Sequence, residues 1–277
     1  MSKTLFDLTL DLARLLETVS EGLATGGSTT TIADSVERTE ADDYWNGGSA
    51  WITYDAGGLG AAPQGEYGYV SDFVQSTGTI TLRTALTTAV ASGDRYAIAT
   101  PRYPLQLLIQ KVNETLDVIE KTDTTTITIA SSTLEYTLPT DCRELKQVWL
   151  QTDADVNDWQ QVHDWYVQKS ATGSANKLVF RRQHTAGYAV KLVYEPYHAY
   201  LRIATDKLDD GINARQVVHD AAVRCVLWRK AKVGDSDLSV NDLLNFYQNL
   251  AATVRQEAPA TRPKRKAKTI HPVFPRP

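Results

Sequence analysis

Four short segments of this chain each carry one apolar face, and two long segments rich in threonine, valine and aromatic residues separate them. Apolar residues three and four positions apart share one face of an α-helix, so this spacing predicts amphipathic helices. We expect helices over residues 5–19, 105–121, 213–232 and 240–254. The residues expected to pack the helices together or against other subunits are Leu5, Leu8, Leu12, Leu16, Leu105, Leu108, Val112, Leu116, Leu243, Leu244, Tyr247 and Leu250.

The two separating segments read as β-structure. They contain short runs of alternating β-branched and aromatic residues, with glycine-containing turns such as Asn46-Gly47-Gly48 and Gly93-Asp94 between many of them. We expect strands near residues 29–32, 50–54, 69–74, 79–82, 126–129, 134–139, 146–150, 177–180 and 189–194.

A helix with one apolar face must cover that face, and the simplest way is to pack the four helices together. The predicted fold class is therefore α+β: a small four-helix bundle with two inserted antiparallel β modules of barrel or sandwich type, and an extended carboxy-terminal arm. The expected boundaries are 1–25, 101–122 and 206–256 for the bundle, 26–100 for the first β module, 123–205 for the second, and 257–277 for the arm.

Charge is divided unevenly along the chain. The net charge is −4, but residues 255–277 carry +6, which leaves −10 on residues 1–254. A domain that grips DNA would be basic over a folded face, so the body does not fit that class. The basic tail, rich in proline, has three possible interpretations: a nucleic-acid or localisation patch, a solvated tail, or an arm that docks on a partner. The residues that would dock are Arg262, Lys264, Arg265, Lys266, Lys268, Ile270, Val273 and Phe274.

Motifs that carry chemistry are weak in this sequence. The five histidines are scattered, Cys142 and Cys225 stand far apart with no CxxC, and Gly57-Gly58-Leu-Gly60 lacks the lysine and helix of a phosphate loop. The acidic run at 153–158 has aspartate where a calcium loop needs glycine. We therefore expect no catalytic residue, cofactor or metal, and not an enzyme; a cell-wall hydrolase is the weakest alternative.

The expected compartment of the protein is inferred from its hydrophobic segments. There is no run of 18 apolar residues, so we expect no membrane span, and the amphipathic start does not resemble a signal peptide. The protein is expected to be soluble and intracellular, or part of an assembly built inside a cell.

Aromatic residues suggest a second class of function. Six tryptophans and thirteen tyrosines lie mostly in the predicted β modules. They are ordinary core and strand-pairing residues, or they form a contact surface, because aromatics dominate interface anchors. The alternative function is therefore a receptor- or glycan-binding tail or fibre protein, with exposed aromatics around Trp45, Trp51, Trp159 and Trp165.

The first β segment contains a series of short motifs: Gly26-Gly27-Ser28 with Ile32-Ala33-Asp34, Asp43-Tyr44-Trp45-Asn46-Gly47-Gly48, Pro63-Gln64-Gly65-Glu66, Val70-Ser71-Asp72-Phe73, Ser76 to Leu82, and Ser92-Gly93-Asp94-Arg95-Tyr96. In these motifs the segment resembles the β module of head-to-tail adaptor, or connector, proteins of tailed double-stranded DNA bacteriophages. The resemblance covers about 100 residues of sequence and the helices only in their arrangement. The strands at 135–139 and 178–180 fit large versions with a second inserted β module.

This resemblance implies a structural role in the virion. Such adaptors form a homo-oligomeric ring, usually of about twelve copies, between the portal protein and a downstream tail or nozzle protein. Their helices line the DNA channel, and their carboxy-terminal arms commonly reach the portal. The implied location is the neck of the virion, after assembly in the host cytoplasm. An acidic body suits a channel through which DNA passes without sequence-specific binding, because like charges remove the drive from counterion release.

Overall fold

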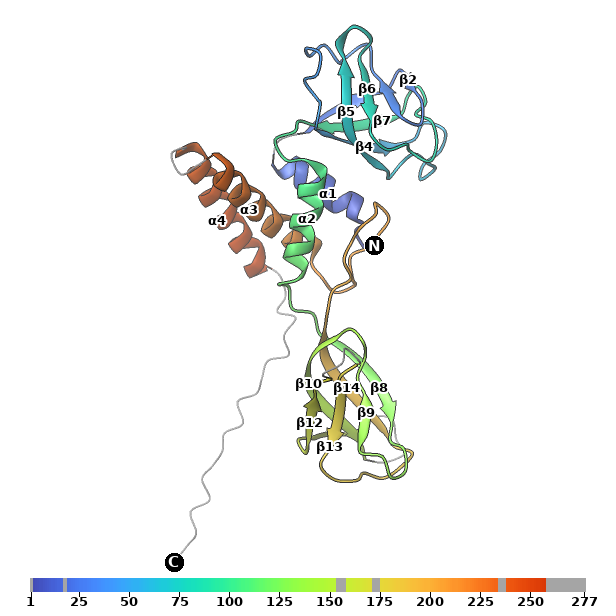
Figure 1. Ribbon diagram of the computed structural model, residues 1–277, viewed down its shortest axis with the longest axis vertical. Helices are drawn as coiled ribbons and strands as arrows, with labels where there is room; N and C mark the ends of the chain where they lie inside the picture. Colours follow the sequence, from blue (N-terminus) through green and yellow to red (C-terminus); the bar gives the residue numbers. More distant parts are fainter. Residues whose placement is uncertain (1, 17–18, 153–157, 171–174, 234–237, 258–277) are drawn as a thin grey trace, which may run out of the picture. The chain divides into compact units, whose positions relative to one another are not determined.

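The computed structural model describes residues 2–16, 19–152, 158–170, 175–233 and 238–257 (Figure 1). The fold is α+β, with four α-helices and antiparallel sheets in the described residues. The chain divides into two units. Residues 1–120 and 197–258 form the first unit, which holds the helices and the first β module; residues 121–196 of the second unit form the other β module.

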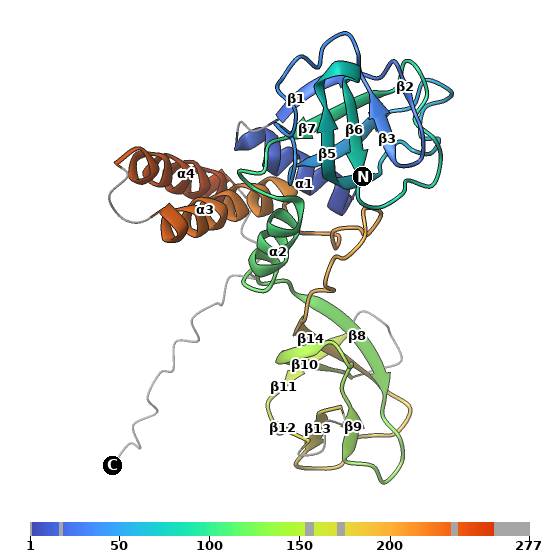
Figure 2. The same ribbon diagram turned by 45° about the horizontal axis from the view of Figure 1, so that its top comes forward.

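The helices are α1 (Leu5–Leu15), α2 (Leu105–Leu116), α3 (Ala214–Val233) and α4 (Leu238–Glu257). α3 packs against each of the other three, and α1 also contacts α2; Figures 1 and 2 both show α3 and α4 side by side. A capping box fixes the start of α1: the Thr4 hydroxyl accepts the Asp7 backbone N–H, and the Asp7 carboxylate accepts the Thr4 backbone N–H. No helix of the described chain is long and apolar enough to cross a membrane.

Helix α1 differs from its prediction in two ways. The helix ends at Leu15, and Val19 begins a strand instead of continuing the helix. Valine is β-branched, and β-branched residues favour strands over helices. The helix is also not single-faced, because Phe6, Thr9 and Leu10 are buried along with the predicted leucines. On this additional face, Thr9 contacts Trp51 of the first β module.

The first β module is a seven-stranded sheet with strand order β1-β7-β4-β5-β6-β3-β2, and all its pairings are antiparallel (Figure 2). The strands are β1 (Val19–Leu23), β2 (Gly26–Gly27), β3 (Thr31–Ala33), β4 (Ser49–Tyr54), β5 (Tyr67–Val74), β6 (Thr79–Leu82) and β7 (Arg95–Ala99). Side chains alternate along a strand, so β4 serves two cores. Ala50 and Ile52 join the module's own core, whereas Trp51 packs among the helices and donates its indole N–H to the Thr9 hydroxyl at 3.2 Å.

The second β module has two antiparallel sheets around one apolar core. Sheet order is β11-β10-β14-β8 in one and β12-β13-β9 in the other. The strands are β8 (Asp123–Thr128), β9 (Glu135–Thr137), β10 (Cys142–Gln151), β11 (Trp159–Val162), β12 (Trp165–Gln168), β13 (Lys177–Phe180) and β14 (Ala189–Pro196). The predicted closure of either module into a barrel or sandwich, the four-helix bundle and the four-part division of the chain stay predictions.

A connecting segment, residues 197–213, leads from β14 to α3 and is held against α1 and α2. The Asn113 amide donates to the Leu201 carbonyl and accepts the Leu201 N–H, at 2.9 and 2.8 Å. His198 bridges the Ile119 carbonyl and Asp209, and the Leu5 N–H donates to the Asp206 carbonyl. These contacts fix where the chain re-enters the first unit after the second β module.

Candidate functional site

The twelve helix residues predicted for packing lie in or against one apolar core. Ten of them, from Leu5 through Leu116 together with Leu244 and Tyr247, are buried; Leu243 and Leu250 are half-buried against the same cluster. They therefore pack the helices of one chain together. The eight predicted arm residues, Arg262 through Phe274, lie outside the described residues.

Helix α3 carries a basic surface that sequence analysis missed. Five of its side chains are Lys or Arg, and only Asp220 is acidic. The Asp220 carboxylate forms an ion pair with Arg255 of α4 at 2.9 Å. The missed signal was the run from residue 224 to 232, where four basic residues occur without an acid inside a helical pattern.

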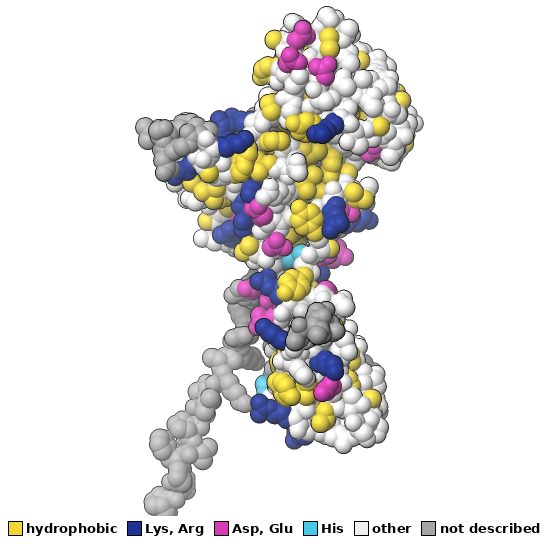
Figure 3. All heavy atoms as spheres, viewed as in Figure 1, with side chains coloured by type: hydrophobic (Ala, Val, Ile, Leu, Met, Phe, Trp, Pro, Cys, Tyr) yellow, Lys and Arg dark blue, Asp and Glu magenta, His cyan; other side chains and the backbone are white. Residues whose placement is uncertain are grey.

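We define the basic face of α3 as Arg224, Leu227 and Lys230, which follow one another at three-residue spacing on one side of the helix. Leu227 is 44% exposed, and the Arg224 guanidinium lies 4.0 Å from Glu114 of α2. The face thus combines an exposed apolar side chain with two cations. Figure 3 shows Lys and Arg side chains gathered with exposed hydrophobic ones over the α3–α4 hairpin.

The first β module is strongly acidic. Residues 19–100 contain ten Asp or Glu against three Arg, a net charge of −7. We define its acidic end as the exposed side chains Val36, Glu37, Asp42, Asp43, Tyr44 and Asp72. Two of these are large apolar groups, with Val36 74% and Tyr44 51% exposed. Acidic side chains gather at this end of the module in Figure 3.

Backbone contacts join the two segments of the acidic end. The Asp42 carboxylate accepts the Gln75 N–H at 2.6 Å, and the Asp43 N–H donates to the Phe73 carbonyl at 3.0 Å. Residues 37–43 therefore lie beside the end of β5, which carries Asp72. Asp43 itself has φ of 65°, a left-handed conformation that aspartate tolerates better than most residues.

A buried polar cluster holds the loop that presents the acidic end. Tyr96 donates its hydroxyl to Asp34 at 2.6 Å, the Arg38 guanidinium lies 3.6 Å from the same carboxylate, and all three side chains are at most 5% exposed. Arg38 also donates to the Ser20 hydroxyl and the Glu21 carbonyl. Burial, with the hydrogen bond to Asp34, raises the pKa of Tyr96. Charges buried in this way need each other, so the cluster ties the loop to β1 and β7.

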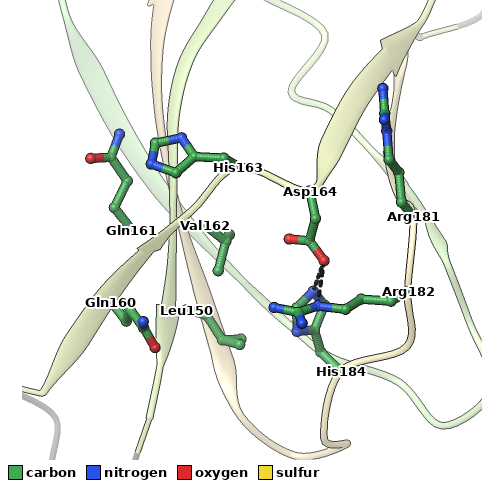
Figure 4. Close-up of a pocket in the computed structure, with 9 residues that line it drawn as sticks. All are labelled: Leu150, Gln160, Gln161, Val162, His163, Asp164, Arg181, Arg182 and His184. Carbon is green, nitrogen blue, oxygen red and sulfur yellow. Dashed lines mark ion pairs between the residues drawn. The ribbon is translucent and has the colours of Figure 1, made fainter. Parts of the chain in front are cut away.

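The second β module contains a polar pocket of about 420 Å³, drawn in Figure 4. Asp164 points at Arg182 and His184, with ion-pair distances of 2.7 and 3.3 Å, and His163 points away from them. Arg181, two glutamines and two aliphatic residues complete the lining. The Asp164 carboxylate thus forms an ion pair with Arg182 of the same pocket and lies beside the His184 ring.

Chemically, this pocket is suited to holding a small polar group. Its nine lining residues include no Ser, Thr, Cys, Tyr or Lys that could act as a nucleophile. Within the described part of the chain, no three His, Cys, Asp or Glu side chains are placed to hold a metal ion.

Cys142 and Cys225 are both buried, and burial raises their thiol pKa to about 11 and about 12, so neither is an activated nucleophile.

The four tryptophans that were expected to be exposed at the tips of the β modules differ in their exposure. Trp45 is 4% exposed and Trp51 is fully buried, so both belong to cores and the prediction of exposure was wrong for them. Trp159 and Trp165 are half-buried on the second module.

Comparison with known protein families relates this chain to a family of adaptor proteins. The model of the family described as SU10 adaptor protein matches residues 79–267, which include the end of the first β module, all of the second, and helices α2, α3 and α4. Most of the residues that carried the sequence resemblance precede this range. A comparison with curated proteins gives no match. Since the matched range is more than half of the chain, the protein belongs to the SU10 adaptor protein family of phage adaptor-type proteins.

Proposed function

We propose that this protein is a structural, non-enzymatic virion component that forms a ring of about twelve copies between the portal and the tail. The observation that carries the proposal is the family match over residues 79–267, because an adaptor family implies contacts with other head and tail proteins. The downstream partner is a tail or nozzle protein, and the carboxy-terminal arm docks on the portal.

In this proposal DNA passes through the ring without being read. The net charge of −10 on residues 1–254 supports it, since a channel built from this body gains little from counterion release when DNA enters. Residues 258–277 of the arm carry +6 and are rich in proline, and an extended proline-rich segment loses little entropy when it lies in a partner's groove.

Negative-stain microscopy of the purified full-length chain, with and without the portal ring of the same phage, tests this function. We expect a ring alone or on the portal, and loss of portal attachment when residues 258–277 are deleted. A chain that stays monomeric beside its portal, with or without the arm, would overturn the proposal.

The alternative of a receptor- or glycan-binding protein has lost part of its basis, since two of its four aromatic anchors, Trp45 and Trp51, are buried. Strong hits on a glycan array would revive it.

A further inference from the structure

The pocket of the second β module lies where β11 passes into β12 and where β13 ends (Figure 4). The Arg181 backbone N–H donates to the Asp164 carbonyl at 2.7 Å, so the residues after β13 are held against the turn between β11 and β12. All nine lining residues belong to this one module. A site in this pocket is thus complete within one chain and goes beyond the ring proposed above.

The accessible charge of this pocket is positive. Asp164 is the only acid among the nine lining residues, and both oxygens of its carboxylate are buried. The carboxylate lies 2.7 Å from the Nε of Arg182, whose side chain is 72% exposed, so the two terminal nitrogens of the guanidinium remain available as donors. Arg181 is exposed and forms no ion pair with any described residue. A ligand in the pocket therefore meets two cations.

His184 fixes the other side of the Asp164 carboxylate. Its ring lies 3.3 Å from that carboxylate and packs edge-on against Phe180, with ring centroids 4.8 Å apart, and only 7% of the side chain is exposed. The carboxylate is thus held between a buried ring and Arg182. The ion pair in turn limits how far the Arg182 guanidinium can swing, so one of the two cations is positioned before a ligand arrives.

The opposite side of the pocket is uncharged. Gln160 and Gln161 lie across from Asp164, and the side chains of Leu150 and Val162 lie between the two sides (Figure 4). A glutamine amide both donates and accepts hydrogen bonds, and the aliphatic pair offers a small apolar surface. The pocket therefore presents cations on one side, amides on the other, and apolar contact between them.

This arrangement discriminates between classes of ligand. The two arginines repel a cation. Inorganic phosphate pairs with the arginines but makes no use of the apolar surface, and a neutral sugar uses the amides but gives the arginines no countercharge. A sugar acid meets all three features, because it combines a carboxylate, a rim of hydroxyls and a ring with C–H groups.

We propose that this pocket binds a saccharide residue that carries a carboxylate, a uronic acid. The carboxylate accepts hydrogen bonds from Arg181 and Arg182, the ring hydroxyls exchange hydrogen bonds with Gln160 and Gln161, and the ring packs on the two aliphatic side chains. The cavity of about 420 Å³ lies within the range of small-molecule sites.

Saturation-transfer difference NMR on the full-length chain, with sodium galacturonate as the ligand, tests the site. A single sugar ring makes few contacts, so we expect a dissociation constant of about 1 mM. Galactose has the same ring with a hydroxymethyl group in place of the carboxylate, and inorganic phosphate is an anion without the ring. Each is expected to bind at least about fivefold more weakly than galacturonate.

Two variants locate the binding. Arg181→Gln removes one cation and leaves the ion pair between Asp164 and Arg182 intact, and R181Q/R182Q removes both cations. We expect each to weaken galacturonate binding by about fivefold or more. The matched control, K169Q/K191Q, removes two cations from exposed positions of the same module outside the pocket and is expected to bind galacturonate like wild type. Circular dichroism melting verifies that the variants are folded, and if R181Q/R182Q is not, R181Q decides.

Any of three results in folded protein overturns the site: no saturation transfer from wild type to galacturonate, binding of galactose or phosphate as tight as that of galacturonate, or wild-type affinity in R181Q. A galacturonate trimer separates two sources of the same chemistry. Tighter binding of the trimer than of the monomer assigns the site to an acidic polysaccharide, and equal binding assigns it to a free sugar acid. Normal rings on the portal without galacturonate binding refute this site alone, whereas galacturonate binding without rings refutes only the proposed function.

Discussion

At the scale of single residues, Asp34 is the centre of the buried polar cluster in the first β module. Its carboxylate is fully buried between the Tyr96 hydroxyl and the Arg38 guanidinium. Asp34→Asn keeps the size but removes the fully buried countercharge of Arg38, and the carboxylates that remain near Arg38, those of Glu40 and Glu37, are more exposed to water. We expect the free energy of unfolding to fall by about 3–5 kcal/mol, measured by urea denaturation followed by tryptophan fluorescence.

The control is Asp72→Asn, which makes the same chemical change on an exposed side chain of the same β module. It is expected to change stability by less than about 0.5 kcal/mol. Equal effects of the two substitutions would show that Asp34 does not anchor the loop.

The buried thiol of Cys225 is expected to make the folded chain less stable at alkaline pH. Burial raises its pKa to about 12, above that of a thiol in the unfolded chain. The contribution of the Cys225 thiol to the free energy of unfolding is complete below the pKa that the thiol has in the unfolded chain. It is lost as the pH rises through the pKa of the thiol in the folded chain. We expect wild type to lose up to about 1.4 kcal/mol per pH unit from this group between about pH 9 and 12.

Urea denaturation at several pH values measures this slope. Cys225→Ala removes the group, so its stability should fall less steeply over that window, although its value at pH 7 is lower because of the cavity. Parallel slopes for the two proteins would contradict the assignment.

At the scale of elements, the first helix depends on its cap. Thr4→Ala removes the hydroxyl that accepts the Asp7 N–H, and we expect a loss of about 1 kcal/mol in the free energy of unfolding. Thr88→Ala, on an exposed loop residue, is the matched control and should be close to neutral. A thermal melt of both variants distinguishes them, and identical melting temperatures would mean that the cap does not stabilise the fold.

The sequence predicted most elements, because helical and strand periodicities differ. Runs such as Trp51–Tyr54 and Thr79–Leu82 lie in strands as expected. β7 was missed because Tyr96-Ala97-Ile98-Ala99 is continuously apolar: it is buried on both faces, so alternation is absent. β12 was missed because it is only four residues long and alternates between apolar and polar residues only once, at Val167-Gln168.

The surfaces were less predictable than the elements. Helical periodicity separates buried from exposed positions, but the approach of residues 37–43 to Asp72 depends on contacts across 30 or more positions, such as Asp42 to Gln75. The basic face of α3 was visible in the order of residues and was overlooked because charge was weighed in the tail alone. Sequence patterns thus locate cores better than they locate interfaces between loops.

At the scale of the whole molecule, charge separation predicts how the protein treats DNA. Residues 1–257 carry a net −10, whereas residues 258–277 contain six cations and no acid. Full-length protein should therefore retain double-stranded DNA weakly at low salt, whereas protein that lacks 258–277 should not retain it, because its net charge opposes contact with phosphates.

Electrophoretic mobility shifts over a salt series measure the difference. For up to six phosphate contacts, the logarithm of the association constant should fall with the logarithm of salt concentration with a slope as steep as about −5. Replacing Lys264, Arg265, Lys266 and Lys268 by glutamine keeps the length of the arm and should reduce the slope to about −2, since two cations remain. If truncated protein bound DNA as tightly as full-length protein, the folded body would have to present its cations, those of α3 first, to the DNA, and passage through a ring of such bodies would no longer be free of binding.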